Sequence, residues 1–182
     1  MAAPLPVRFT AGDGGQWRIA AVLPVIGESL LPAARLEVRE GPAEAPPGVW
    51  SLHGVTSNLR YTTVEERAGL VAKQEGLGRA PARHAALIPI SKNAAWWAMA
   101  QDERRAIMET RSRHNAIGME YLPEVARRLH HCRDLGGEFD FLTWFEWAPE
   151  HEAKFEALLV RLRASEEWHY VSREVDIRLV RD

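Results

Sequence analysis

The sequence has a single cysteine, Cys132, among its 182 residues. One cysteine excludes an internal disulfide, a four-cysteine zinc site and a covalently attached haem of the CxxCH type. No apolar run approaches the roughly 18 residues of a membrane span, and residues 1–10 lack the charged head and apolar stretch of a secretory signal. We therefore expect no membrane association and a cytoplasmic location, or a periplasmic one if a signal has been removed.

An excess of charge of either sign is also missing. The sequence contains 23 lysines and arginines against 25 aspartates and glutamates, for a net charge of -2. This balance predicts neither nucleic-acid binding nor a polybasic membrane signal. Hydrophobic residues make up 46% of the chain, which excludes intrinsic disorder. The length is typical of one domain, and we treat residues 1–182 as a single unit.

Common signatures of nucleotide binding and hydrolysis are absent, namely GxGxxG, GxxxxGK[ST], HExxH and GxSxG. The adjacent histidines His130 and His131 suggest a metal site at first sight. In a strand, however, they point to opposite faces, and in a helix they diverge by about 100°. We therefore do not expect this pair to chelate one ion.

The hydrophobic pattern switches between a strand period and a helix period along the chain. Strand-like segments are residues 17–25, 49–61, 84–90, 139–147 and 171–179, helical segments are 63–76, 93–119 and 155–162, and a proline-rich loop is expected at 37–48. Residues 127–132 precede Gly136 and Gly137 and fit a hairpin with the following strand. This order favours an α+β fold with helices packed on one face of an antiparallel sheet.

Seven tryptophans are many for this length. They suit core packing, and alternatively a pocket for a large flat apolar ligand. Trp96 and Trp97 follow Lys92 at a strand-to-helix turn, where an anionic-ligand site and ordinary packing both fit. His114 lies at the join of two helical pieces, where a ligand and a structural histidine are both plausible. The residues alone thus indicate an α+β domain with an aromatic pocket.

A series of short motifs also runs along the chain in a defined order. They are Pro24–Ser29, Ser57–Tyr61, Gln74–Arg79, Ala86–Lys92, Trp96–Trp97, the spacing from His114 to Arg127, Cys132–Leu135, Phe139–Glu146, Glu166–Trp168 and Arg173–Arg178. Together they resemble the chlorite dismutase family of haem b proteins, in particular its short-chain branch. The resemblance covers nearly the whole chain, from about residue 16 to residue 181.

The resemblance implies a ferredoxin-like α+β fold of the dimeric α/β-barrel type. It divides the single domain into a shortened N-terminal half of about residues 1–92 and a haem-binding half of about residues 93–182. It further implies a homodimer, non-covalent haem b, and conversion of the small anion chlorite to chloride and dioxygen, with the O–O bond formed at the haem iron.

The resemblance also implies roles at the iron. His114 matches the proximal iron ligand and Arg127 matches the distal arginine. Glu167 matches the carboxylate that accepts a hydrogen bond from the proximal imidazole, in preference to Glu166 beside it. Gln74 matches a distal position near Arg127.

Four further positions match residues that hold the haem propionates or close the pocket around them. These are Asn58, Tyr61, Lys92 and Trp96. The implied roles agree with the chemistry of the side chains, because a carboxylate fixes the tautomer and raises the basicity of a ligating imidazole. A permanently charged, planar guanidinium suits an anionic substrate.

Other readings of the sequence stay open. Iron-coproporphyrin decarboxylases share the fold and the proximal histidine, but typically carry a neutral residue in place of the distal arginine, so Arg127 disfavours that activity. A peroxidase-like haem protein is a second alternative, and a non-catalytic haem-binding module is a third.

Overall fold

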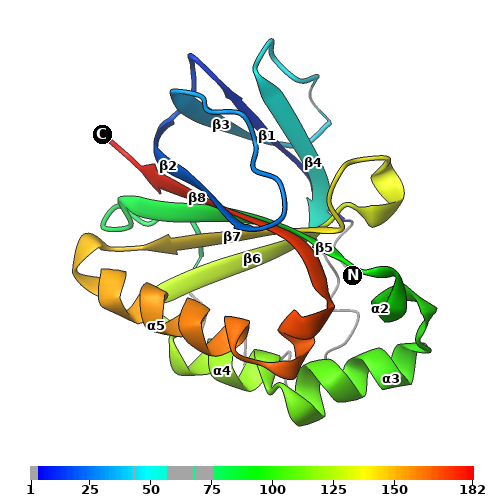
Figure 1. The fold of residues 1–182 in the computed structure, drawn as a ribbon. Coiled ribbons are helices and arrows are strands. Elements are labelled where there is room, and N and C mark those ends of the chain that lie inside the picture. Colours follow the sequence, from blue (N-terminus) through cyan, green and yellow to red (C-terminus); the bar gives the residue numbers. More distant parts are fainter. Residues whose placement is uncertain (1–3, 43, 57–67, 69–75) are drawn as a thin grey trace.

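The computed structural model describes residues 4–42, 44–56, 68 and 76–182. Its strands form a closed antiparallel barrel in the order β1-β3-β2-β8-β5-β7-β6-β4 (Figure 1). The strands are β1 (Pro6–Gly12), β2 (Trp17–Ile26), β3 (Arg35–Glu40), β4 (Trp50–Thr56), β5 (His84–Lys92), β6 (Val125–His131), β7 (Phe141–Trp147) and β8 (Val171–Val180).

Every second side chain of these strands points into the barrel, which is the consequence of the two-residue period of a strand. Aromatic rings fill much of this interior. Trp144 stacks on Phe9 with ring centroids 5.7 Å apart and meets the edge of Trp17 at 5.4 Å. All three rings are almost fully buried. Several of the tryptophans therefore serve core packing, as one of the two sequence interpretations holds.

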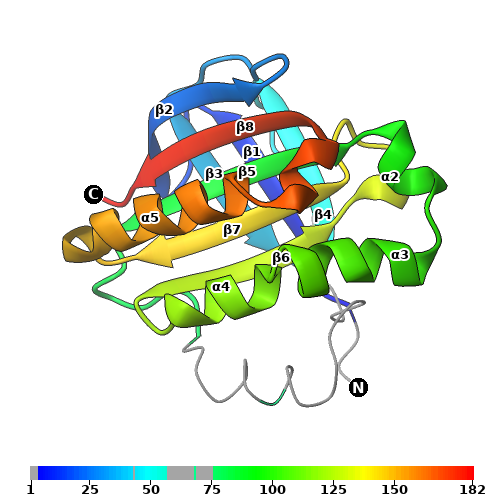
Figure 2. The ribbon, with the colours of Figure 1, turned by 60° about the horizontal axis from the view of Figure 1, so that its bottom comes forward.

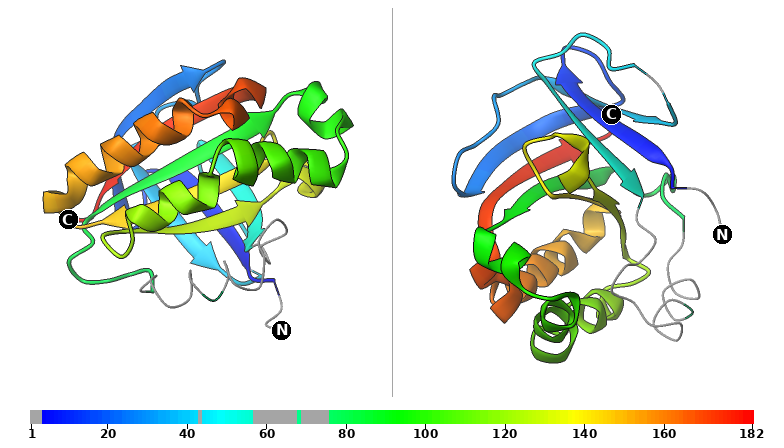
Figure 3. Two further views of the ribbon diagram at one scale, coloured as in Figure 1. Left: turned by 90° about the horizontal axis from the view of Figure 1, so that it is seen from below. Right: turned by 90° about the vertical axis from the view of Figure 1, so that its right-hand side faces the viewer.

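The helical segments gather on one side of the barrel, along the outer face of β8, β5, β7 and β6 (Figures 2 and 3). They are α2 (Ala94–Ala98), α3 (Gln101–Arg105), the π-helix η1 (Ala106–Arg111), α4 (His114–Glu120), α5 (Glu152–Arg163) and the 3-10 segments η3 (Pro149–His151) and η4 (Glu166–Tyr170). The 3-10 segment η2 (Arg133–Leu135) lies apart from them, in the connection between β6 and β7. None of the helices in the described ranges is long and apolar enough to cross a bilayer.

A second hydrophobic cluster lies between the strands and α5. Phe155, Leu158, Leu159 and Leu162 follow helical spacing and are all buried. The ring of Phe155 stacks on Trp147 of β7, with centroids 3.8 Å apart. Burial of such a side chain stabilises a fold by about 1.5–3 kcal/mol, so this face of α5 suffices to dock the helix.

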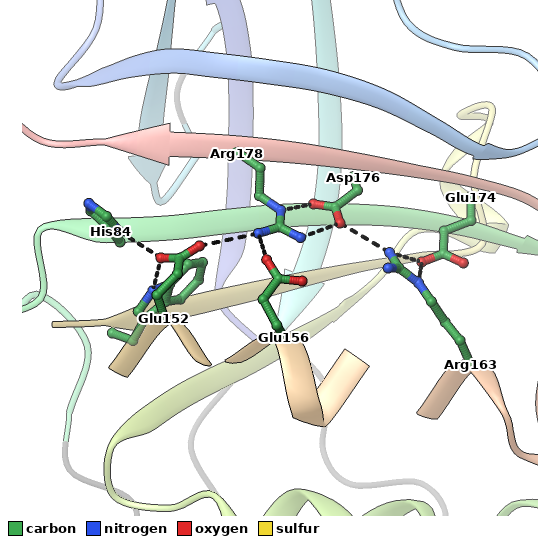
Figure 4. A network of polar contacts seen from close by, with 8 residues as sticks. His84, Glu152, Glu156, Arg163, Glu174, Asp176 and Arg178 are labelled. Atoms are coloured by element: carbon green, nitrogen blue, oxygen red, sulfur yellow. Dashed lines mark hydrogen bonds and ion pairs between the residues drawn. The ribbon is translucent and has the colours of Figure 1, made fainter. Parts of the chain in front are cut away.

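A row of ion pairs runs beside this cluster, between β8 and α5 (Figure 4). Arg163 of α5 donates to Glu174 at 2.7 Å and to Asp176 at 3.1 Å. Arg178 binds Asp176 and also reaches Glu156 of α5. Because Glu174 and Asp176 are fully buried, their charges need these guanidinium partners. The network fixes how α5 and the chain after it lie on β8.

The structure confirms the antiparallel strands, the helices on one side and the hairpin of β6 with β7. It corrects the ferredoxin-like sheet to a closed eight-strand barrel. Closure depends on β1, which the sequence did not predict, and on β3, which begins at Arg35 and extends into the residues 37–48 predicted as a loop. The prolines that follow β3 favoured the prediction of a loop for these residues. The predicted helix 63–76 falls almost wholly outside the described residues.

Candidate functional site

His114 owes its position to a break between two helices. The chain runs through α3 and the π-helix η1, whose C-terminal end is Arg111. Arg113 then adopts a left-handed conformation with φ of 53°, and His114 begins α4. Left-handed backbone is unfavourable for a residue other than glycine, and π-helical turns are often found at functional sites. The turn directs the imidazole toward η4 and β5.

The imidazole of His114 contacts a buried carboxylate. Its Nδ1 lies 2.7 Å from Oε2 of Glu167, which belongs to η4. The other oxygen, Oε1, accepts from Nζ of Lys92 at the end of β5, at 2.8 Å. The side chains of Glu167 and Lys92 are 5% and 2% exposed, whereas that of His114 is 25% exposed. The three groups form a line from the interior to an accessible ring.

The electrostatics of this line favour an ionised carboxylate. Burial raises the pKa of the Glu167 carboxyl, but the charges and hydrogen bonds of His114 and Lys92 outweigh that effect and lower the pKa to about 2. An ionised Glu167 keeps a proton on Nδ1 of His114. The lone pair of Nε2 is then free to bind a metal.

Several contacts fix η4, and with it the carboxylate. The backbone N–H of Glu167 donates to Oγ of Ser112 at 2.9 Å. Next to it, Nε1 of Trp168 donates to Glu174 of the ion-pair row at 2.8 Å. The ammonium group of Lys92 lies 4.5 Å from the ring centroid of Trp96 and 5.6 Å from that of Trp168. Cation–π contacts of this kind are attractive, so Lys92 is held from two sides.

Arg127 enters the site from β6. Its guanidinium lies against Gly118 of α4, where a Cβ atom would come within 1.9 Å of Nη1. Its Nη2 is 3.5 Å from Oδ1 of Asn115. Burial lowers the pKa of Arg127, and the carboxylates of Glu109 and Glu167 act in the opposite direction. The guanidinium stays charged, because an arginine side chain is not deprotonated in proteins.

The chemistry of these residues fits a metal that brings most of its own ligands. Among the residues that the structure describes, no group of three or more histidines, cysteines or acids could hold an ion. A metal on Nε2 of His114 would therefore take its other ligands from a non-protein group such as a porphyrin. The buried Nε1 of Trp96 has no hydrogen-bond partner among the described residues, and it suits a carboxylate of such a group. Gly118 leaves room for the guanidinium of Arg127 to lie against α4.

The structure thus brings together five of the predicted site residues: His114, Arg127, Glu167, Lys92 and Trp96. The nearest partner of Lys92 is Glu167, and its predicted role toward the propionates stays a prediction. The three remaining predicted residues, Asn58, Tyr61 and Gln74, lie outside the described residues.

The sequence interpretation missed two contributors, Ser112 and Gly118. Gly118 follows His114 by one helical turn, and this spacing could have identified it, because residues four apart share a helix face. Ser112 has no comparable signal. Its hydroxyl meets Glu167 across 55 residues of sequence, a separation that no local pattern spans.

The adjacent histidines point to opposite faces, as predicted. His130 lies in the barrel, where its ring meets Phe9 at 5.2 Å and its Nδ1 donates to the carbonyl of Leu142 at 3.0 Å. Burial lowers the pKa of His130 to about 4, so its ring is neutral at pH 7. His131 instead packs against Phe141 on the outer face.

Comparison with known proteins identifies the family to which the chain belongs. A family model described as chlorite dismutase matches residues 33–181. A crystal structure of a dimeric chlorite dismutase from Nitrobacter winogradskyi is 56% identical, with a TM-score of 0.90, over 96% of this chain and 99% of that one.

Two further comparisons extend over different lengths. A chlorite dismutase from Ideonella dechloratans is 36% identical over 99 residues, which are 53% of this chain and only a third (33%) of that relative. A mutant chlorite dismutase from Candidatus Nitrospira defluvii in complex with cyanide is 18% identical, with a TM-score of 0.66, over 98% of this chain and 91% of that one. At that identity the likeness concerns the fold alone.

Proposed function

Because the chain belongs to the chlorite dismutase family, we propose that it is a haem b enzyme that converts chlorite to chloride and dioxygen. The observation that carries this proposal is the contact of His114 with the ionised, buried Glu167 at 2.7 Å, with the charged Arg127 between β6 and α4. An imidazole with such a carboxylate partner is typical of a metal ligand. A guanidinium nearby suits a reaction whose substrate and product are both anions.

Non-covalent haem b would be held by Nε2 of His114, and the buried N–H of Trp96 would donate a hydrogen bond to one of its carboxylates. When bound, haem supplies a redox-active iron at which the O–Cl bonds of chlorite are broken and the O–O bond is formed. Glu167 contacts the imidazole of His114, and Lys92 contacts Glu167. Glu167 keeps the proton on Nδ1 and makes Nε2 more basic, and Lys92 neutralises the buried carboxylate.

Arg127 acts on the anions. The overall conversion of chlorite to chloride and dioxygen consumes and releases no proton, so no general base is needed. The guanidinium binds chlorite through its planar N–H groups and retains the chlorine-containing anions until chloride leaves. Its contribution is positioning and charge stabilisation. Gln74, which lies outside the described residues, is proposed as a second polar group of the distal side.

Oxygen release tests the proposed activity. Haem-loaded protein is mixed with chlorite in an oxygen electrode, beside free haem and Arg127→Ala, with chloride measured in parallel. We expect rapid oxygen release with matching chloride from the unmodified protein alone. Arg127→Ala should keep its Soret band, lose turnover and bleach faster as hypochlorite escapes. A clean Soret band without oxygen release would refute the activity and favour decarboxylation, peroxidation or haem binding.

We also propose that the chain forms a homodimer. The support is the 56% identity to a structure described as a dimeric chlorite dismutase. Light scattering during size-exclusion chromatography should give twice the 20.5 kDa mass of one chain. A mass of 20.5 kDa at micromolar concentration would contradict this proposal.

A further inference from the structure

A cavity lies beside Trp97, where α2 and α3 approach the end of β6. It has a volume of about 320 Å³. Its lining residues are Val55, Trp97, Gln101, Arg104, His131, Cys132, Arg133, Asp134, Leu135 and Phe141. The polar lining groups are thus two arginines, an amide, a histidine, a thiol and one carboxylate, beside the rings of Trp97 and Phe141. None of the residues that surround His114 in the preceding sections lines it.

The indole of Trp97 is fixed in place. Its Nε1 donates to Oδ2 of Asp140 at 3.2 Å, and its ring stacks on Phe141 with centroids 6.0 Å apart. Two guanidinium groups lie over this ring. That of Arg133 is 3.6 Å from the ring centroid and that of Arg104 is 5.4 Å away. A guanidinium stacked on an aromatic face is pre-organised, and its N–H groups point sideways from the stack.

One of the two arginines, Arg133, already has a carboxylate partner, Asp140, which lies outside the lining. Both carboxylate oxygens of Asp140 already accept hydrogen bonds. Oδ1 accepts from Arg133 at 3.0 Å, and Oδ2 accepts from the backbone N–H of Lys92 at 2.7 Å. Arg104 has a buried Nε without a hydrogen-bond partner among the described residues. The carboxylate that lines the cavity, Asp134, is exposed. A buried donor without a partner is unfavourable, and an anion with two oxygens would satisfy it.

The cavity continues the face of β6 that carries Arg127. Side chains alternate along a strand, and Ala126 and His130 are buried in the barrel. Arg127, Leu129 and His131 therefore share the outer face. Arg127 meets α4 at one end of this face, and His131 lines the cavity at the other.

We propose that the Trp97 cavity is an anion-binding site in which Arg104 and Arg133 bind a group with two oxygen atoms and a single negative charge. Two sources share this chemistry. One is a carboxylate arm of the porphyrin, and this source rests on the proposed function. The other is a free oxyanion such as chlorite, held on the way to or from Arg127.

Three variants test the site: Arg104→Gln, Arg133→Gln and the control Arg105→Gln. Arg105 is next in sequence to Arg104 and does not line the cavity. Arg104→Gln is the leading variant, because Arg133 also pairs with Asp140 and its loss affects the fold. Urea unfolding of each variant separates a binding effect from a folding effect.

The first measurement is the affinity for haem b and for its dimethyl ester, by Soret titration of the full chain. If the site binds a porphyrin carboxylate, Arg104→Gln weakens haem binding at least about tenfold, which corresponds to about 1.4 kcal/mol. Binding of the ester stays unchanged, as does binding of haem to the control.

The second measurement is a titration with sodium acetate, followed by the indole N–H signal of Trp97 in NMR spectra and assigned with Trp97→Phe. If the site binds a free anion, the unmodified chain shows a saturable shift that Arg104→Gln abolishes and Arg105→Gln retains. The inference is overturned if Arg104→Gln matches the control in both measurements. A chain that binds no haem but shows the acetate shift would refute the proposed function and leave this site standing.

Discussion

Replacement of Glu167 by glutamine changes one atom of the site and removes one charge. The wild-type carboxylate accepts from two donors, Nδ1 of His114 at 2.7 Å and Nζ of Lys92 at 2.8 Å. Glutamine offers one acceptor oxygen, so one of these donors loses its partner. Either Lys92 stays charged in a position that is 2% exposed, or His114 turns its Nδ1 into an acceptor and carries its proton on Nε2. The second outcome blocks the nitrogen that would bind iron.

The size of the effect follows from the pKa of the carboxyl. A fall from 4.5 to about 2 corresponds to about 3 kcal/mol at 1.36 kcal/mol per pKa unit. We therefore expect Glu167→Gln to lower the free energy of unfolding by about 3 kcal/mol at pH 7. Because the folded-state pKa of Glu167 is depressed, this stabilisation is complete above the unfolded value of 4.5 and is lost as the pH falls toward 2. The difference between wild type and variant should shrink over that range.

The neighbouring residue provides a matched control. Glu166 pairs with Arg111 at 3.0 Å on the surface, where the two side chains are 35% and 51% exposed. Surface pairs contribute about 0–1 kcal/mol, so Glu166→Gln should have a small effect. Urea unfolding from pH 7 to pH 3 and Soret titration with haem are the assays. Equal stability and equal haem affinity of the two variants would refute the role of Glu167, and with it the choice of Glu167 over Glu166.

Three other substitutions have expected outcomes. Gly118→Ala should change the free energy of unfolding by no more than about 1 kcal/mol, because alanine favours a helix. Its Cβ displaces Arg127 and should weaken haem binding about tenfold in a Soret titration. An unchanged haem affinity would contradict this expectation. The pKa of His130 is lowered to about 4 in the folded chain. As the pH falls from 6.5 to 4, the unfolded chain therefore binds a proton at this position before the folded chain does, and the free energy of unfolding decreases. His130→Asn should remove up to about 3 kcal/mol of this decrease, measured by urea unfolding. Trp168→Phe removes the donor to Glu174 and should cost about 1–2 kcal/mol of unfolding free energy, whereas no loss would show that the contact is dispensable.

Local pattern predicted most elements of the half that contains the site. The alternation of residues 139–147 and 171–179 predicts β7 and β8, and the spacing of the apolar residues in α5 predicts its buried face. Barrel closure was beyond local pattern. It depends on β1 and β3 and on the contact of β4 with β6, which pairs only two residues of β4. Such short pairings are decided by the packing of the whole interior, not by the periodicity of one segment.

The site shows the same limit at the level of single residues. The sequence indicated that Lys92, beside Trp96, has the chemistry to bind an anion, and the structure supplies that anion from the chain itself, because Glu167 reaches Lys92 from 75 residues away. A resemblance across the whole chain was needed to select His114, Glu167 and Arg127 among many residues of the same types. Residue chemistry thus predicted what Lys92 needs, whereas only the fold determines which carboxylate meets that need. Glu167 meets it at 2.8 Å, so the ammonium group of Lys92 already has a carboxylate partner within the protein.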